Sequence, residues 1–134
     1  RGLREYKNAI APPPERKFKT EVHYYYGDSG VGKSRRAASE AESTGEPIYY
    51  KPRSKWWDGY EQQPNVIIDD FYGWIPYDEL LKIMDRYPYR VPIKGGYEVS
   101  NSKRIWITSN SPIETLYHHP HVVPEALIRR CTVI

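Results

Sequence analysis

A glycine-rich turn between a predicted strand and a predicted helix constrains the fold of this chain more than any other feature. Residues 27–34 read GDSGVGKS and fit the pattern G-x-x-x-x-G-K-S. An apolar run over residues 22–26 precedes the turn, and a stretch rich in Ala, Glu and Arg follows it. Glycines allow a tight loop whose backbone N–H groups converge on phosphate oxygens beside the first turn of a helix. The pattern therefore predicts an α/β fold with a phosphate-binding loop after its first strand.

The residues of this loop have separable roles in binding a nucleoside triphosphate. Lys33 is expected to bring positive charge to the β- and γ-phosphates, and the hydroxyl of Ser34 is the expected Mg²⁺ ligand. The other predicted nucleotide contacts come from Gly27, Asp28, Ser29, Gly30, Val31 and Gly32. The simpler alternative is a glycine-rich turn that contains Lys-Ser by chance, which the flanking strand and helix disfavour.

The length and composition indicate one compact domain. A chain of 134 residues can form a core without disulfides or metals, and its single cysteine, Cys131, excludes an intramolecular disulfide. The net charge of +3 comes from residues 1–20, which hold six Lys/Arg against two Glu, whereas residues 21–134 hold fourteen against fifteen acids. The first segment is therefore either a solvated basic stretch or a DNA contact, and net charge alone does not decide between them. We expect residues 1–20 to be a basic leading segment and residues 21–134 to be the folded domain.

Predicted strands and helices alternate along the chain. Apolar, β-prone runs predict strands at 21–26, 47–51, 65–71, 104–108 and 131–134. Apolar spacing and capping residues predict helices at 33–43, 76–87 and 124–130, and a short helix over 1–11 that the prolines at 12–14 end. Gly95-Gly96 between apolar flanks predicts a β-hairpin over 90–99. These elements together predict a mainly parallel sheet with helices on both faces and a hairpin insert.

Polar side chains directly follow two of the predicted strands, at the edge where parallel α/β sheets bind ligands. Asp69 and Asp70 follow the apolar run 66–68. We expect Asp69 to bind Mg²⁺ beside the loop hydroxyl and Asp70 to act as the general base. Asn110 follows the apolar run 105–107 and is expected to sense the γ-phosphate or to hold the attacking water. The alternatives are a solvated strand end for the acids and a turn for the amide.

The order of several short motifs resembles one family closely. The sequence resembles the helicase domain of circovirus-type replication-associated proteins, which are superfamily 3 helicases within the AAA+ group of P-loop NTPases. The resemblance spans about residues 20–134, and the run from 56 to 74 is more specific than the phosphate loop alone. The motifs that carry it are GDSGVGKS (27–34), KWWDGY (55–60), VIIDDFYGW (66–74), DRYP (85–88), KGG (94–96), ITSN (107–110) and EALIRR (125–130).

This resemblance implies an ATP-driven motor that moves along single-stranded DNA as a ring homo-oligomer, with six as the expected number of subunits. ATP and Mg²⁺ are then the expected cofactors. In the family, the hairpin before the sensor strand touches DNA, which makes Lys94 the strongest candidate for a phosphate contact and Lys103 and Arg104 weaker ones. An exposed turn lysine is the alternative for Lys94. Arg129 or Arg130 occupies the position of the arginine that completes the neighbouring subunit's site.

The resemblance also implies parts that lie outside this sequence. Residues 1–20 correspond to part of the oligomerisation region, and an N-terminal endonuclease domain is expected in the complete protein, which the family implies acts in the host nucleus. No metal-binding H-x-H pair with a following tyrosine is recognisable, since His118-His119-Pro120-His121 lies in a proline-bounded loop. We therefore expect no nickase activity from this chain, and its short apolar runs predict no membrane span.

Two other functions stay open at this point. One is a small-molecule P-loop kinase, which would need an arginine-rich lid that no segment between the motifs provides. The other is a module that binds nucleotide only in order to assemble a complex, without unwinding activity of its own. The aromatic pair Trp56-Trp57 is expected to pack between the sheet and a loop or neighbouring subunit, with stacking on a base or on DNA as the alternative.

Overall fold

Five parallel strands form the central sheet of the chain. The computed structural model describes residues 14–27, 32–117 and 124–133, so the helix predicted over residues 1–11 and loop residues 28–31 lie outside it. The strand order is β2-β3-β6-β1-β7, and every neighbouring pair is parallel. The predicted parallel sheet is confirmed, and its strands are β1 (Glu21–Tyr26), β2 (Ile48–Tyr50), β3 (Asn65–Ile68), β6 (Arg104–Ser109) and β7 (Thr132–Val133).

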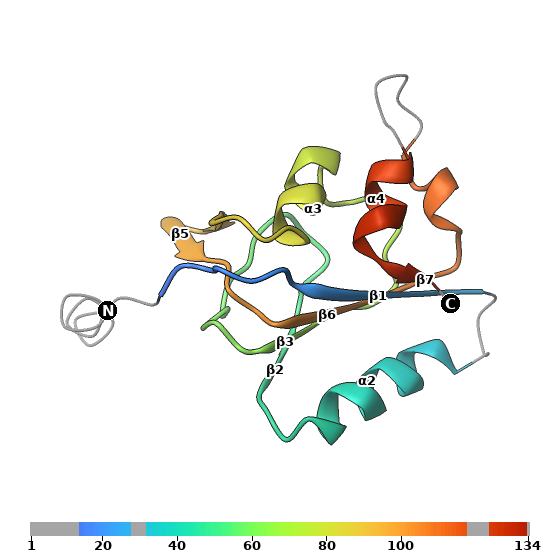
Figure 1. Cartoon of the computed structure of the whole chain (residues 1–134), viewed down its shortest axis with the longest axis horizontal. Coiled ribbons are helices and arrows are strands. Elements are labelled where there is room, and N and C mark those ends of the chain that lie inside the picture. The colour runs from blue at the N-terminus through green and yellow to red at the C-terminus, as the bar shows by residue number, and fades with distance from the viewer. Residues whose placement is uncertain (1–13, 28–31, 118–123, 134) are drawn as a thin grey trace.

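Helices cover both faces of this sheet, as the alternating pattern predicted. Helix α2 (Lys33–Ser43) lies on one face, whereas α3 (Tyr77–Ile83) and α4 (Pro124–Arg130) lie on the other (Figure 1). A 3-10 turn, η1 (Ile113–Thr115), follows the sheet strand β6. None of the described helices is long and apolar enough to cross a membrane.

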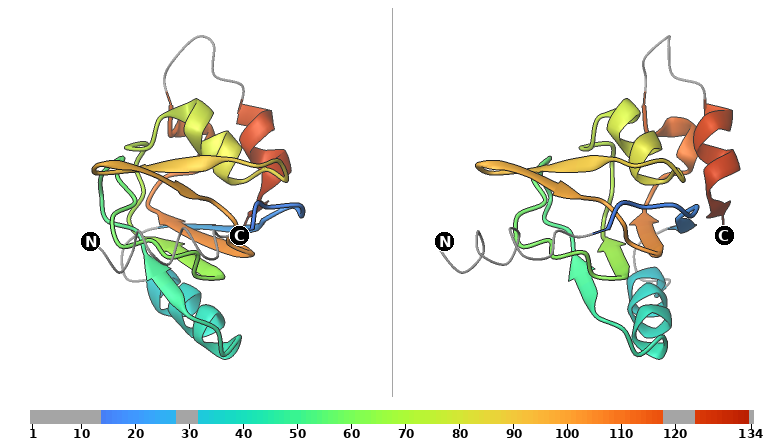
Figure 2. Two further views of the ribbon diagram at one scale, coloured as in Figure 1. Left: turned by 90° about the vertical axis from the view of Figure 1, so that its left-hand side faces the viewer. Right: turned by 60° about the vertical axis from the view of Figure 1, so that its left-hand side comes forward.

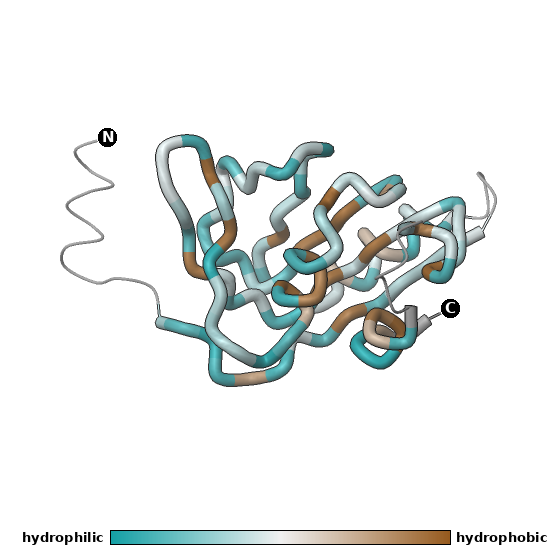
Figure 3. Tube along the Cα trace, turned by 90° about the horizontal axis from the view of Figure 1, so that it is seen from above, coloured by the Kyte–Doolittle hydropathy of each residue, from teal (hydrophilic) through white to brown (hydrophobic). Residues whose placement is uncertain are grey.

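The core has two unequal parts, one on each face of the sheet. The larger part lies between the sheet and helices α3 and α4, and hydrophobic and hydrophilic stretches alternate along the trace (Figure 3). The smaller part lies beneath α2 and consists of Tyr25, Ala37, Ala41, Ile67 and Trp106. Successive residues of a strand point to opposite faces, so β3, which is buried along its whole length, contributes to both parts.

A two-stranded hairpin projects from the domain at the far end from the start of α2. It consists of antiparallel strands β4 (Arg90–Ile93) and β5 (Gly96–Val99), and Figures 1 and 2 show it away from the first turn of α2. The predicted hairpin is therefore confirmed. Its two turn residues are Lys94 and Gly95, one position earlier than Gly95-Gly96.

The helix predicted over 76–87 is shorter than its apolar spacing suggested, because a buried arginine takes over its last carbonyl groups. The α-helix ends at Ile83. Arg16 is only 1% exposed and donates hydrogen bonds to the carbonyl oxygens of Ile83 at 2.7 Å, Lys82 at 2.7 Å and Tyr87 at 2.7 and 3.1 Å. These bonds satisfy C-terminal carbonyls that would otherwise need another turn or water. Burial lowers the pKa of Arg16, although Asp85 opposes that shift. Arg16 is therefore part of the core, which corrects both the solvated and the DNA-contact interpretation at that position.

The strand predicted over 65–71 also ends early, at Ile68, because the chain turns sharply there. Asp70 has a left-handed backbone with a φ of 53°, and Gly73 has a φ of 93°. A Cβ atom on Gly73 would lie 2.7 Å from the carbonyl oxygen of Leu116, so only glycine fits that position. The turn brings the segment after β3 back against the segment after η1.

A buried lysine organises the loop between β2 and β3. Lys51 is 6% exposed, and its ammonium group donates to the carbonyl oxygens of Pro52, Ser54 and Trp56. The same ammonium group lies 5.3 Å from the ring centre of Trp57 and 5.2 Å from that of Trp74. Such cation–π contacts and carbonyl bonds replace the water that the charge lost. The buried side chain of Lys51, the first residue of the loop, therefore holds the loop backbone in place.

The second tryptophan of the pair, Trp57, confirms the packing interpretation of the sequence. Its side chain is 1% exposed and stacks on Tyr49, with the ring centres 5.8 Å apart. Trp56 is half-buried, and the ammonium group of Lys55 lies 4.7 Å from its ring centre. Trp57 is therefore closed off from a base or from DNA by the core around it.

We predict that Lys51 makes the free energy of unfolding rise with pH between about 8 and 10.5. Burial lowers the pKa of Lys51 from 10.5 to about 8, with Glu79 and Asp58 opposing it. Over that range the unfolded chain holds a proton on Lys51 that the folded chain has released. The contribution of Lys51 to the free energy of unfolding therefore rises with pH. Urea unfolding of the wild-type chain and of Lys51→Met should diverge by up to about 3 kcal/mol across the range. Parallel curves for the two proteins would contradict the assignment, because all other titrating groups are shared.

Candidate nucleotide site

The carboxyl ends of β1, β3 and β6 meet at one edge of the sheet, where α2 begins. Tyr26 at the end of β1 lies opposite Ser109 of β6, and Ile68 at the end of β3 lies opposite Ile107 of β6. The polar residues that follow these strands therefore come together, as the sequence predicted from their order. The four residues Asp28, Ser29, Gly30 and Val31 lie outside the described part of the chain.

The first helical turn of α2 is set by the glycine before it. Gly32 occupies the N-cap position with a left-handed φ of 80°, a conformation that side chains with a Cβ adopt only with strain. Gly27, at the other side of the loop, donates its N–H to the carbonyl oxygen of Ser109 at 3.2 Å. Gly27 thus ties one end of the loop to the edge of the sheet, and the N-terminal N–H groups of α2 are directed to the same edge.

Two hydroxyl groups converge on the carboxylate of Asp69. The hydroxyl of Ser34 donates to Asp69 Oδ1 at 2.6 Å, and the hydroxyl of Thr108 donates to the same oxygen at 2.6 Å. Thr108 Oγ1 also accepts the backbone N–H of Asp70 at 3.0 Å. One threonine therefore fixes the positions of both acids. The Thr108 hydroxyl was missed from the sequence, because the role at the end of this strand was given to the amide two residues later.

The predicted phosphate lysine and the predicted sensor amide are also in contact. Lys33 Nζ donates to Asn110 Oδ1 at 3.0 Å, joining the start of α2 to the end of β6. An amide oxygen that holds this ammonium group sets its direction without neutralising its charge. The structure therefore brings together Lys33, Ser34, Asp69 and Asn110, four of the residues that sequence reasoning selected.

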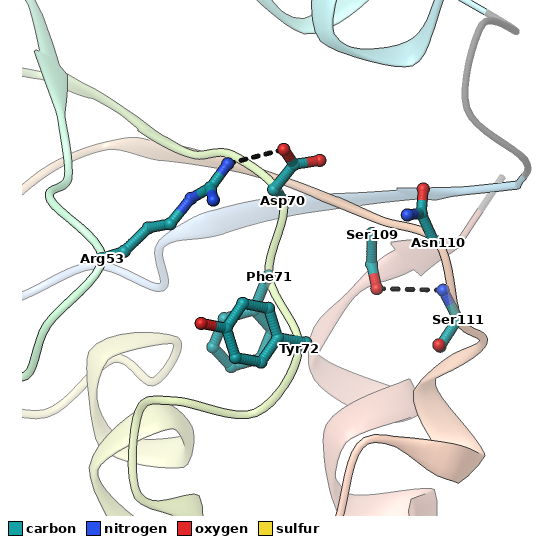
Figure 4. A pocket seen from close by; sticks show the side chains of 7 residues that line it. All are labelled: Arg53, Asp70, Phe71, Tyr72, Ser109, Asn110 and Ser111. Atoms are coloured by element: carbon teal, nitrogen blue, oxygen red, sulfur yellow. Dashed lines mark hydrogen bonds and ion pairs between the residues drawn. The ribbon is translucent and has the colours of Figure 1, made fainter.

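Asp70 faces a cavity of about 270 Å³ beside this cluster. Figure 4 shows Asp70 between Arg53, which reaches in from the β2–β3 loop, and Asn110, which lies across the cavity after β6. Arg53 Nη2 lies 2.6 Å from Asp70 Oδ2, and both side chains are about half exposed. The left-handed backbone of Asp70 is uncommon for a residue with a Cβ and is typical of functional turns. Arg53 was not predicted, although it precedes one of the motifs and follows the strand next to β3.

The Ser34–Asp69 pair suits Mg²⁺ by its chemistry. Mg²⁺ takes oxygen ligands and is usually held by one or two protein groups together with phosphate oxygens and water. The described residues contain no group of three or more His, Cys, Asp or Glu side chains that would enclose a metal by themselves. A hydroxyl and a carboxylate 2.6 Å apart are therefore a fitting half-set that phosphate and water would complete. The histidines at 118, 119 and 121 lie outside the described residues.

The predicted DNA-contact residues lie at the other end of the sheet strands. Lys94 is exposed at the hairpin turn, where its backbone N–H donates to Asp58 Oδ1 at 2.8 Å. Lys103 comes just before β6, and its ammonium group lies 3.4 Å from Glu46 Oε2. Arg104 lies 2.9 Å from Glu46 Oε1, and its hydrogen bond, together with the charge of Lys103, lowers the pKa of Glu46. Lys103 and Arg104 thus share one acid, whereas no ion pair of Lys94 is found among the described residues.

The two candidate arginines of α4 differ in their surroundings. Arg130 donates to the carbonyl oxygen of Ala126 at 2.7 Å and lies 3.2 Å from Asp85 Oδ2. Burial opposes the charge of Asp85, but the N–H of Arg86 and the guanidinium of Arg130 outweigh it and lower the pKa of Asp85. Arg129 is exposed. The structure therefore separates two residues that the sequence left equivalent.

Neither arginine lies at the edge of the sheet where the parallel strands of its own chain end. Both line a second cavity, together with residues 19–22 at the start of β1. β1 is six residues long, so roughly 20 Å separates that cavity from the end of the strand that leads into the phosphate loop. An arginine side chain does not span that distance.

Comparison with known proteins identifies the family. Residues 23–111 match the family described as RNA helicase. The chain is 56% identical to the replication-associated protein of Human associated cyclovirus 1 over 136 aligned residues, which cover 99% of this chain and 49% of that protein. It is 48% identical to the protein of the same name from Beak and feather disease virus, and 46% identical to that of Porcine circovirus 2. Each alignment covers 98% of this chain, but only 44% and 42% of those relatives.

The chain thus spans less than half the length of these curated relatives. The family match covers the phosphate-loop motif, both acids and Asn110. Among the described residues of this set, the fold gathers Lys33, Ser34, Asp69 and Asn110 at one edge. The parallel α/β sheet with its hairpin insert agrees with it. This chain therefore belongs to the superfamily 3-type helicase family of circovirus-type replication-associated proteins.

Proposed function

We propose that this chain is the ATP-hydrolysing helicase domain of a viral replication initiator and moves along single-stranded DNA. The observation that carries the proposal is the pair of contacts Lys33–Asn110 and Ser34–Asp69. They join the phosphate-loop motif to both strands that supply the chemistry, in one chain and at one sheet edge. A glycine-rich turn with a chance Lys-Ser would have no reason to make both contacts.

The proposed reaction is attack of water on the γ-phosphorus, which breaks the bond to the bridging oxygen and releases ADP and phosphate. The ammonium group of Lys33 and the N–H groups at the start of α2 bind the phosphates. Asp70 accepts the proton of the attacking water, and Asn110 positions that water. Mg²⁺, held by Ser34 and Asp69, would neutralise charge on the β- and γ-phosphates.

The hairpin supplies a surface suited to single-stranded DNA. Its outer face pairs Pro92 with Tyr97, whose side chain is 70% exposed, and Arg90 lies at the exposed base of the same face. Lys94 lies at the turn. An aromatic ring beside cations stacks on bases and pairs with phosphates without reading sequence. These features support DNA contact at the hairpin in preference to Lys103 and its neighbour.

The proposal includes a ring in which one subunit completes the site of the next. Arg129 is the better candidate for the arginine that acts across the interface, because it is exposed, whereas Arg130 is bound to Asp85. Its distance from the phosphate loop of its own chain agrees with action on a neighbour. Residues 1–20 are proposed to contribute to the contact between subunits.

We predict that Lys33→Ala abolishes both tight nucleotide binding and hydrolysis. Asp70→Asn should keep its nucleotide affinity but lose at least about a hundredfold in hydrolysis rate, because general-base catalysis contributes about that much or more. Steady-state phosphate release and calorimetric titration with ATP measure the two properties. Glu42→Gln, which changes an exposed residue outside the site, serves as the control. Normal hydrolysis by Asp70→Asn would disprove its role as base, and assembly on ATP without turnover would favour the non-catalytic module.

A second prediction concerns DNA. Lys94→Ala should weaken binding of a fluorescent single-stranded oligonucleotide and reduce the slope of log affinity against log salt by about 0.7, the value for one lost phosphate contact. Fluorescence anisotropy over a range of salt concentrations measures both. Lys103→Ala is the matched comparison and should change the slope less, because Glu46 already binds that ammonium group. Equal slopes for Lys94→Ala and the wild type would remove Lys94 from the DNA surface.

A further inference from the structure

Arg53 lies inside the candidate site but belongs to none of the predicted motifs. It comes from the β2–β3 loop and lines the cavity of about 270 Å³ that Asp70 and Asn110 also line. Its Nη2 atom lies 2.6 Å from Asp70 Oδ2 (Figure 4). Within the described part of the chain, this is the one hydrogen bond found for the guanidinium group. The other N–H donors of its planar fork are therefore available to a ligand in the cavity.

The loop that carries Arg53 is built to hold it in place. The carbonyl oxygens of Pro52, Ser54 and Trp56 all accept from the buried ammonium group of Lys51. The loop closes further through the N–H of Ser54, which donates to the Pro52 carbonyl at 2.8 Å. Residues on both sides of Arg53 are thus fixed, so the backbone of the loop needs no further ordering for Arg53 to face the cavity.

Trp74 connects the turn of Asp70 to the buried ammonium group of Lys51. The indole N–H of Trp74 lies 3.5 Å from the backbone carbonyl of Asp70, and the ring of Trp74 packs 5.2 Å from the Lys51 ammonium group. Lys51 therefore lies between the loop of Arg53 and the turn of Asp70. This arrangement fixes the acid and the arginine relative to one another, from one buried centre.

Arg53 would offset the repulsion between the carboxylate of Asp70 and a phosphate bound in the cavity. A carboxylate that acts as a base beside a triphosphate is repelled by the terminal phosphate, because like charges at short distance disfavour each other. The ammonium group of Lys33 is on the far side, bound to Asn110. A guanidinium group between the acid and the phosphate binds both, since its fork matches carboxylate and phosphate oxygens.

We propose that Arg53 contacts the γ-phosphate of the nucleotide bound by its own chain, while it keeps its bond to Asp70, and so distinguishes triphosphate from diphosphate. The inference rests on the proposed nucleotide-hydrolysing function. A diphosphate lacks the group that Arg53 would contact. Arg53 then acts in the same chain, opposite Lys33, whereas the arginine of α4 acts on a neighbour.

The test is calorimetric titration of the chain with a non-hydrolysable ATP analogue and with ADP, both with Mg²⁺. Arg53→Gln should bind the analogue about tenfold more weakly, the effect of losing about 1.4 kcal/mol, and bind ADP within about twofold of the wild type. Arg53→Lys should lie between, because it keeps the charge but loses the fork. Lys55→Gln, on the same loop and exposed, is the matched control and should change neither affinity.

Three results would overturn the proposal. If Arg53→Gln lowers both affinities equally, the residue only supports the loop. If it lowers the hydrolysis rate as Asp70→Asn does and leaves analogue binding unchanged, it only positions Asp70. If Arg53→Lys binds the analogue as weakly as Arg53→Gln and both unfold at lower temperature than Lys55→Gln, the effect is one of folding. Failure of the proposed function itself gives a different pattern, in which Lys33→Ala binds the analogue as well as the wild type.

Discussion

Two hydroxyl groups that share one carboxylate oxygen hold the working edge of this structure together. Ser34 and Thr108 both donate to Asp69 Oδ1 at 2.6 Å, a short distance typical of hydrogen bonds to a charged acceptor. The three residues belong to α2, to β6 and to the segment after β3. Because these elements are separate in sequence, one acid fixes the relative position of the phosphate-loop helix and the two strands beside it. The contacts of Lys33, Asp70 and Arg53 depend on that position.

A second acid, Glu40, holds α2 against the sheet through hydrogen bonds to strands β1 and β6. Glu40 accepts from the indole N–H of Trp106 at 3.0 Å, from the hydroxyl of Tyr25 and from Arg36 at 3.1 Å. Burial, together with the bond to Glu40, raises the pKa of Tyr25 to about 12. The apolar part of this interface is small, so these directional bonds prevent α2 from sliding along the sheet. The helix that begins with Lys33 and Ser34 is therefore held at both ends.

Much of the fold was predictable because its signals are local. The phosphate-loop pattern, the buried strand before Asp69 and the turn glycines each constrain the backbone within a few residues. Parallel pairing then brings the strand ends to one edge, so the contact between Lys33 and Asn110 follows from the order of the motifs. The hairpin and α4 were predicted from equally local signals, and the family resemblance added only the expected roles of their residues.

What sequence reasoning missed depends on contacts between distant segments. Arg16 lies 67 positions before Ile83, whose carbonyl oxygen it binds. The local sequence around either residue therefore does not indicate that the arginine is buried or that α3 ends at Ile83. The pairing of Arg53 with Asp70 requires β2 to lie next to β3, which only the strand order establishes. Lys51 is the last residue of a predicted strand, and no local signal indicates that three carbonyl groups and two indole rings enclose its ammonium group.

Our central proposal is that this chain holds half of a nucleotide-hydrolysing site and that Arg129 of a neighbouring chain completes it. The most direct test is the rate of ATP hydrolysis per subunit in mixtures of Lys33→Ala and Arg129→Ala, with single-stranded DNA present. Each variant alone should be inactive, and the mixture should regain activity that rises with protein concentration, because an interface then combines an intact phosphate loop with an intact arginine. Inactive mixtures under conditions where association is shown independently, or full activity of Arg129→Ala alone, would contradict the claim.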